Sequence, residues 1–266
     1  YAFNPIVLIS YAGEAHFDSM MMLPLVGALF AYERGWKHLA VVLASLATGI
    51  KWICWPLIPF FAGKRLASGA LLAGLVLLLP AIYFWETLPQ LWEGLFKFGA
   101  TRSFNGPVYD SLLAVGLPRS ICSALVASGF AGVVLWRWRV RARLALDSHI
   151  RWILGALILL SPTVHFWYIA WILPFVCLRP SMPWLTFSLS GGAYFFVWLN
   201  AAGGSWELQA WQQVLFWLPF FLGCLYELWS TRGRVVLPRR RSDSEPGGRI
   251  AVVIPTLNIG DRLSHA

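Results

Sequence analysis

The sequence predicts an all-α protein that crosses a membrane several times, and three observations support this fold class. Hydrophobic residues fill 58% of the 266 positions and charged residues only 12%, whereas roughly a quarter of the residues in a soluble domain are charged. Tryptophan occurs 16 times. Apolar runs alternate with short basic clusters, as membrane helices alternate with cytoplasmic loops. The net charge of +9 therefore fits a lipid bilayer as partner, and no nucleic acid is expected.

Five apolar segments are predicted to be transmembrane helices. The clearest comprises residues 66–85, because about 20 residues are needed to cross a hydrocarbon core of roughly 30 Å. The others are residues 17–33, 120–136, 184–201 and 209–229. Basic clusters follow the segments 17–33, 120–136 and 209–229, and the densest of the membrane part follows residue 136: Arg137, Arg139, Arg141 and Arg143. Such clusters indicate the cytoplasmic side.

Two further apolar segments are predicted to fold back on themselves. Residues 38–63 and 152–178 have basic residues at both ends and polar, proline-containing centres, GIKWICWP and SPTVHFWY. As straight helices they would leave basic residues on the outside, against the positive-inside bias. We therefore expect two broken, re-entrant hairpins, whose irregular tips are tolerated only beside protein or a water-filled cavity. This places Lys51 and His165 on the wall of an outward-facing cavity.

Three ionisable residues, Glu14, His16 and Asp18, lie directly ahead of the first apolar segment. Such groups are costly at the mouth of a membrane span unless they have a partner or water, so they indicate a functional site. The alternative is a solvated loop in which Asp18 is the N-cap of the helix. Capping explains only one of the three groups, which favours the functional interpretation.

The same region resembles a known family of enzymes. An Asn-Pro pair at Asn4, a short amphipathic run and then Gly-x-x-His-x-Asp, ending at Asp18, look like the GT-C type polyprenol-phosphate-sugar-dependent mannosyltransferases. The resemblance extends loosely over most of residues 4–229. It implies a GT-C like membrane fold and an enzyme that moves a sugar, mannose by analogy, from a polyprenyl-phosphate carrier to a glycan or glycolipid acceptor on the outer face.

The resemblance also implies roles for the ionisable residues. GT-C enzymes carry their key aspartate in the first outer loop, after the first membrane helix. In an internal, N-terminally truncated fragment that residue would lie upstream of Tyr1. Asp18, His16 and Glu14 are therefore expected to support catalysis rather than to supply the principal base.

Lys51 is predicted to bind the donor phosphate. A lysine in the middle of an apolar hairpin cannot easily reach the interface, and a phosphate oxygen would hold its ammonium group charged. The alternative is a lysine at the hairpin tip that reaches the outer headgroups.

Three further residues are predicted to bind substrate. His165 and Tyr168 lie in SPTVHFWYIAWILPF, which resembles a Pro-x-x-His/Pro-x-Trp-Tyr-x-x-Trp-x-x-Pro signature of the same family; the alternative is an interfacial aromatic belt. Asn105 follows an aromatic residue in the outer segment 86–118, as an asparagine does in a long outer loop of these enzymes. That segment could equally be a lid, and its residues 91–99 are expected to form a helix in the interface plane.

The composition changes after residue 231. Residues 232–248 are a basic linker containing Pro and Gly. Residues 249–266 open with IAVVIP, a short β-branched run typical of a buried parallel strand. The run RIAVVIPTLNIGDRL resembles the first strand of glycosyltransferase family 2, an α/β domain of GT-A fold that includes dolichyl-phosphate mannose synthases.

This second resemblance implies a nucleotide-sugar pocket. Its contacts are assigned to Pro255, Thr256, Asn258 and Asp261, although the position after Asn258 is commonly Glu in the family and is Ile259 here. No cofactor is implied for the membrane part. A divalent cation, Mg or Mn, is implied for the truncated family 2 portion, whose metal-binding acids would lie beyond Ala266.

Two other function classes fit parts of the pattern. A polytopic lipid or sugar flippase or transporter would also use broken helices and intramembrane charge, but its repeated halves are not evident. A non-catalytic membrane anchor predicts no cavity and leaves Lys51 and His165 facing lipid. The four cysteines lie in apolar runs without C-x-x-C spacing, so no metal site is expected. The expected location is the plasma membrane, with the C-terminal tail in the cytoplasm.

Overall fold

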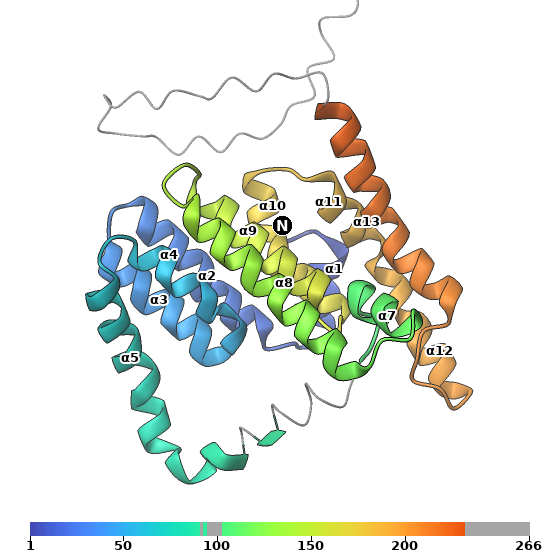
Figure 1. Cartoon of the computed structure of the whole chain (residues 1–266), viewed down its shortest axis with the longest axis horizontal. Coiled ribbons are helices and arrows are strands. Elements are labelled where there is room, and N and C mark those ends of the chain that lie inside the picture. Colours follow the sequence, from blue (N-terminus) through green and yellow to red (C-terminus); the bar gives the residue numbers. More distant parts are fainter. Residues whose placement is uncertain (91–92, 95–102, 232–266) are drawn as a thin grey trace, which may run out of the picture. The chain divides into compact units, whose positions relative to one another are not determined.

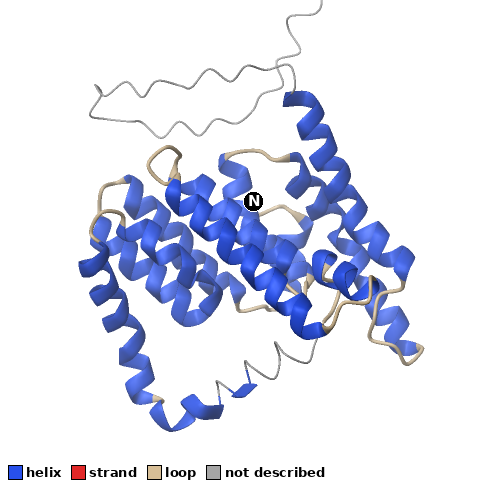
Figure 2. Ribbon diagram, in the orientation of Figure 1, coloured by secondary structure: helices blue, strands red, loops and turns tan. Residues whose placement is uncertain are grey.

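The computed structural model describes residues 1–90, 93–94 and 103–231. This part of the chain is mostly helical and contains no named strand, as the all-α prediction requires (Figures 1 and 2). The predicted interfacial helix at residues 91–99 falls largely outside the described residues. The linker at 232–248 and the family 2 strand at 249–266 lie wholly outside them, together with Pro255, Thr256, Asn258 and Asp261.

The first long helices form an antiparallel pair. Helix α2 (Asp18–Glu33) turns at Gly35, whose φ of 81° is readily adopted only by glycine, into α3 (Lys37–Ile50). Along α3, Ala40, Ala44 and Ala47 are fully buried. Small side chains at helical spacing let two helix backbones approach closely, and α2 packs along this alanine face.

The first predicted hairpin is present as a broken segment. Helix α3 ends at Ile50, Lys51 is extended (φ −147°), and a 3-10 helix, η2 (Trp52–Leu57), leads into the short helix α4 (Ile58–Ala62). Two prolines, Pro56 and Pro59, lack the N–H group that a continuous helix would use. Helix α4 packs back on α3, so the chain returns to the end from which α3 began.

The second predicted hairpin is broken in the same way. Helix α9 (Leu146–Leu160) is followed by an extended stretch, the 3-10 helix η4 (Phe166–Tyr168) and helix α10 (Ile169–Leu178). Helices α9 and α10 pack on each other. The short helix α7 (Pro107–Ala114) precedes α8 (Arg119–Arg139), which runs beside α9 (Figure 1).

In the part of the chain that the structure describes, two helices are long and apolar enough to cross a membrane. They are α5 (Leu66–Tyr83) and α8, at the positions predicted for residues 66–85 and 120–136. Only 11% of the apolar window of each helix is buried. Their exposed apolar surfaces are suited to contact with lipid. After α5 the chain continues through the 3-10 helix η3 (Trp85–Thr87).

The segment predicted as one transmembrane helix, residues 184–201, is helical throughout, but the helix type changes within it. The structure contains helix α11 (Met182–Ser190), the 3-10 helix η5 (Gly191–Phe195) and helix α12 (Phe196–Ala202). The change coincides with Gly191, where a Cβ atom would lie 2.6 Å from the Cδ1 atom of Ile6. Ile6 belongs to helix α1 (Pro5–Val7), which continues into the π-helix η1 (Leu8–Gly13). The N-terminal segment therefore packs directly against the point where the helix type changes.

The last helix, α13 (Ala210–Thr231), agrees with the predicted segment 209–229 and packs along α11. Thr186 Oγ1 donates to the Pro219 carbonyl at 2.7 Å, and Ser190 Oγ donates to the Phe216 carbonyl at 2.9 Å. These hydroxyl groups join α11 to α13 through backbone oxygens, an arrangement common between membrane helices.

Basic residues from several helices gather at one end of the bundle. This basic end is opposite to the hairpin tips, because each hairpin begins and finishes there. Four contacts connect its helix termini: Arg65 Nη1 with His38 Nε2 (3.5 Å), Phe60 with the His149 ring (5.2 Å), Arg137 Nε with His149 Nδ1 (3.1 Å), and Arg151 Nη1 with the Arg179 carbonyl (2.7 Å). The segregation of charge follows the pattern that the positive-inside bias predicts.

Candidate functional site

An ion pair lies at the end of the bundle opposite the basic end. Asp18, the first residue of α2, and Lys51, at the tip of the first hairpin, are 33 positions apart in sequence. Lys51 Nζ donates to both carboxylate oxygens of Asp18, at 2.8 and 2.9 Å. The Asp18 side chain is 1% exposed and that of Lys51 is 18% exposed. A buried charge of this kind requires a partner, and each residue supplies it for the other.

The second hairpin completes the surroundings of this pair. Trp171 Nε1 of α10 donates to Asp18 Oδ2 at 2.8 Å. The ammonium group of Lys51 lies 4.5 Å from the centroid of the Trp171 ring and 5.1 Å from that of Tyr168, distances typical of cation–π contacts. Asp18 therefore accepts bonds on both oxygens, which suits it to hold Lys51 in place.

The N-cap alternative for Asp18 is not what the structure shows. Helix α2 begins at Asp18, its N-cap is Phe17, and no side-chain capping bond is present there.

Glu14 is exposed, in the turn that precedes α2. Its neighbour Ala15 has a φ of 51°, a conformation that costs a non-glycine residue energy and that is concentrated at functional sites.

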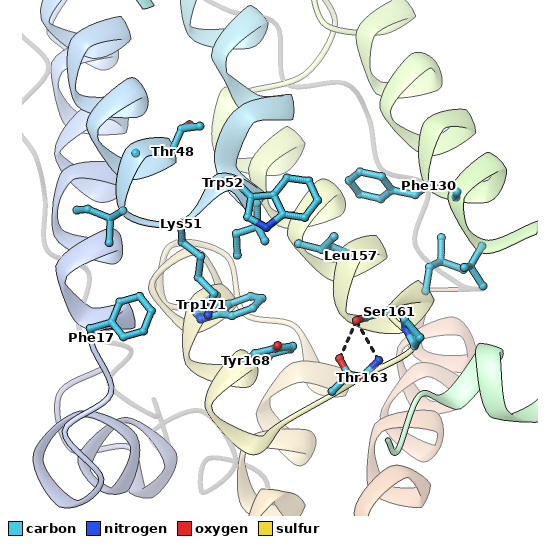
Figure 3. A pocket seen from close by; sticks show the side chains of 17 residues that line it. Phe17, Thr48, Lys51, Trp52, Phe130, Leu157, Ser161, Thr163, Tyr168 and Trp171 are labelled. Carbon is cyan, nitrogen blue, oxygen red and sulfur yellow. Dashed lines mark hydrogen bonds between the residues drawn. The ribbon is translucent and has the colours of Figure 1, made fainter. Parts of the chain in front are cut away.

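A cavity of about 710 Å³ opens beside Lys51 (Figure 3). Tyr168, Trp171 and Phe17 line it near the ion pair, and Phe130 of α8 and Leu157 of α9 line its far side. Among the described residues that form its wall, Lys51 is the only charged one. The site is thus an apolar chamber with one cation, and Lys51 points toward Trp171 at one side of it (Figure 3).

The two predicted histidines lie together, but His165 is not among the residues that line the cavity. His16 stacks on one side of Trp167 at 3.8 Å between ring centroids, and His165 stacks on Trp167 at 4.2 Å. His165 Nδ1 lies 2.8 Å from the hydroxyl oxygen of Tyr194. This aromatic column joins the N-terminal segment to the tip of the second hairpin.

The predicted outer-loop residue Asn105 also lies at this end. It is buried, has a φ of 58°, and accepts from Trp217 Nε1 through both its carbonyl oxygen and Oδ1, each at 3.1 Å. Its Nδ2 group has no hydrogen-bond partner among the described residues. The adjacent Phe104 pairs with the second hairpin tip: its N–H donates to the Pro162 carbonyl at 2.9 Å. Asn105 therefore fixes the loop rather than lining the cavity.

Lys51, Tyr168 and Asp18 were predicted from the sequence, but the contacts among them and with Trp171 were not. Trp171 is the second tryptophan of the SPTVHFWYIAWILPF signature, and nothing in its spacing shows that its indole reaches Asp18. The position of Phe130 in the cavity wall was not predicted, because nothing in the sequence distinguishes it from the other apolar residues of α8.

Burial changes the titration of the histidine at the second hairpin tip. His165 lies between α9 and α10. Burial, with smaller contributions from the nearby positive charges of Lys51 and His16, lowers its pKa to about 4. The folded protein therefore holds this imidazole neutral at pH 7. Burial likewise lowers the pKa of His16.

We expect the stability that depends on His165 to fall on acidification. Between about pH 6.5 and 4 the unfolded chain binds a proton at this site that the folded chain excludes, so stability is complete above this window and declines through it. The loss is about 2 kcal/mol by about pH 4.5. Thermal unfolding of the wild type and His165→Gln in detergent, from about pH 7.5 to about 4.5, measures it. On acidification the unfolding temperature of the wild type should fall more than that of His165→Gln. The control His38→Gln replaces an exposed histidine and should behave like the wild type. Parallel curves for the wild type and His165→Gln would contradict a lowered pKa at His165.

No known family model, curated protein or solved structure matches this chain.

Proposed function

We propose that this chain is the membrane part of a glycosyltransferase that uses a polyprenyl-phosphate sugar as donor, with Lys51 as the residue that binds the donor phosphate. The observation that carries the proposal is the composition of the cavity. An apolar chamber with one charged residue in its described wall matches a ligand that has a hydrocarbon body and one anionic group. A water-soluble sugar nucleotide would require more polar contacts than this wall offers.

The position of the cavity also supports a lipid ligand. Its wall includes Val126, Ala127 and Phe130 of α8, one of the two helices long and apolar enough to span a membrane. Lys51 lies at the end opposite the basic clusters. If these clusters face the cytoplasm, as the positive-inside bias requires, the donor phosphate binds at the outer side of the membrane, where the acceptor glycan or glycolipid is presented.

In this mechanism the acceptor hydroxyl attacks the anomeric carbon of the donor, and the bond from that carbon to the phosphate oxygen breaks. The carrier leaves as a lipid phosphate, and the acceptor proton passes to a base. Lys51 neutralises the charge that develops on the departing phosphate oxygen, a type of stabilisation that contributes strongly to group transfer. Asp18 does not take the proton, because both of its oxygens already accept bonds from Lys51 and Trp171. It positions Lys51.

Two features distinguish this proposal from a membrane anchor. The anchor interpretation leaves Lys51 and His165 facing lipid, whereas Lys51 is paired with a buried carboxylate and His165 lies in the column around Trp167. A passive anchor would gain nothing from two buried charges, because a well-packed apolar pair is usually as stable.

Binding of the carrier tests the proposal directly. The whole chain in nanodiscs is titrated with polyprenyl phosphate and, separately, with uncharged polyprenol, and quenching of tryptophan fluorescence is followed. Lys51→Gln should weaken polyprenyl phosphate binding roughly 10- to 100-fold, the loss expected for a hydrogen bond to a charged group. The polyprenol affinity should not change.

Lys64→Gln, an exposed lysine at the basic end, is the matched control and should bind like the wild type. Equal affinity of the wild type for polyprenyl phosphate and polyprenol would refute the role of Lys51. Carrier movement across the bilayer without sugar transfer would favour the flippase alternative.

A further inference from the structure

A second cavity, of about 730 Å³, lies among helices α8, α9, α11 and α13. It is distinct from the cavity beside Lys51, and among the described residues Leu160 at the end of α9 is the one that lines both. Most of its wall is apolar, with Trp184, Phe220 and Phe221 among the largest side chains. Trp152, which also lines the cavity and is exposed, lies at the edge of the cavity toward the basic end.

The polar residues of this second cavity are concentrated at its basic end. They are Arg151 near the start of α9, Ser181 ahead of α11, and Glu227 near the end of α13. Arg151 is half-buried, and its Nη1 donates to the Arg179 carbonyl at 2.7 Å, which fixes the guanidinium group. Ser181 Oγ donates to Glu227 Oε2 at 3.2 Å. The chamber therefore has a charged mouth and an apolar body.

The surroundings of this mouth carry excess positive charge. Arg137 is buried nearby, with its Cζ atom 5.7 Å from the centroid of the Trp152 ring that lines the cavity. Its bonds go to two neutral acceptors, His149 Nδ1 at 3.1 Å and Ser148 Oγ at 3.0 Å. Arg179 is paired with Asp147 at 2.6 Å. Three arginines, Arg137, Arg151 and Arg179, thus share this region with two carboxylates, so an anionic group at the mouth would be favoured.

The length of the second cavity corresponds to one leaflet of a membrane. Along α9 it extends from Arg151 to Leu160, about 14 Å at roughly 1.5 Å per residue. Half of a hydrocarbon core is about 15 Å. A single acyl chain of a lipid whose headgroup lies at the basic end would occupy this length, whereas a polyprenyl chain would exceed it.

We propose that the second cavity binds a glycerophospholipid of the cytoplasmic leaflet, with its phosphate at Arg151 and one acyl chain between α9 and α13. This rests on the membrane embedding contained in the proposed function but not on sugar transfer. The cations of the two cavities lie at opposite ends of the bundle, so the phospholipid and the polyprenyl phosphate would present their headgroups to opposite faces of the membrane. The acyl chain fills the apolar body of the cavity, between the α8–α9 pair and the α11–α13 pair.

Two blocking variants separate the cavities. Ala156→Phe inserts a ring into the second cavity, and Ala127→Phe does the same in the cavity beside Lys51; neither alanine is fully buried. The whole chain is reconstituted in liposomes of phosphatidylethanolamine and phosphatidylglycerol, extracted in mild detergent, and analysed by native mass spectrometry for retained phospholipid. Binding of polyprenyl phosphate is measured in parallel.

The wild type, Ala127→Phe and Arg141→Gln, an exposed arginine of the same end, should retain one phospholipid per chain. Arg151→Gln and Ala156→Phe should reduce this occupancy by about 10-fold or more while keeping the affinity for polyprenyl phosphate. Equal retention in Ala156→Phe and the wild type would overturn the proposal, as would displacement of the phospholipid by polyprenyl phosphate in Ala127→Phe. Ala127→Phe and Lys51→Gln should both weaken the binding of polyprenyl phosphate by about 10-fold or more. If they bind it like the wild type while Arg151→Gln and Ala156→Phe lose the phospholipid, the proposed function fails and the phospholipid site is retained.

Discussion

Replacing both members of the buried ion pair, in the variant Asp18→Asn with Lys51→Gln, should yield a folded protein that has lost sugar transfer. A single Lys51→Gln change leaves the Asp18 carboxylate buried without its cation, and breaking a buried pair by removing one partner costs about 3–5 kcal/mol. The exposed 18% of the Lys51 side chain places the cost toward the lower end of that range. The double change removes both charges, so no uncompensated charge remains.

The double variant therefore separates folding from function. With Asp18→Asn, the side-chain amide oxygen at this position can still accept the Trp171 N–H, which replaces the bond now made by Asp18 Oδ2. Thermal unfolding should consequently stay close to that of the wild type, whereas each single variant should unfold at a lower temperature.

Transfer should fall by about 100-fold or more in the double variant, because removal of one group that stabilises the developing charge of a transition state typically has an effect of this size. The measurement is transfer of labelled sugar from polyprenyl phosphate by the reconstituted protein, with Lys64→Gln as control. Wild-type transfer by a folded double variant would show that the pair serves only to stabilise the bundle.

The breaks in the helices were predictable where the sequence contains a chemical cause. Pro56 and Pro59 remove backbone donors, and the polar centre around His165 cannot stay in a continuous apolar helix, so both hairpins were expected at the positions where they occur. The pair Gly191 and Gly192 also favours an interruption of a helix, but more weakly than proline does. The change of helix type at this point was not predicted because glycine is common in membrane helices. The close approach of Ile6 to Gly191 appears only in the structure.

Pairing between distant residues was not predictable in the same way. The sequence shows Asp18 ahead of one apolar run and Lys51 inside another, but the distance between them depends on the turn at Gly35 and on where η2 begins. The expectation that Lys51 and His165 share one cavity wall was half met. Lys51 lines the cavity, whereas the ring of His165 stacks on Trp167.

Gly106→Ala should separate the outer loop from the second hairpin tip and impair the site without unfolding the bundle. A Cβ atom at Gly106 would lie 2.6 Å from the Ser161 carbonyl oxygen and 2.9 Å from that of Pro162. These are backbone atoms, so relief requires the loop or the tip to shift. The cost of such overpacking is typically about 1–3 kcal/mol.

The shift would reach the cavity because Ser161, Pro162 and Thr163 all line it. The Phe104 N–H bond to the Pro162 carbonyl and the Val164 N–H bond to the Phe104 carbonyl, at 2.9 and 2.8 Å, would lengthen together. We expect sugar transfer to fall by about 10-fold or more. Hydrogen exchange should become faster at the backbone amide of Val164 in particular, whereas a global loss of stability would affect many amides alike.

Gly132→Ala provides the matched control, because a Cβ at Gly132 of α8 meets no atom within 4 Å. In a helix interior that change should stabilise slightly, by about 0.5–1 kcal/mol, and leave transfer unchanged. If Gly106→Ala lowers the unfolding temperature but keeps both wild-type transfer and wild-type exchange at Val164, then the contact between loop and tip supports the fold alone. The cavity would in that case be shaped by the two hairpins and α8, independently of the loop that Asn105 anchors.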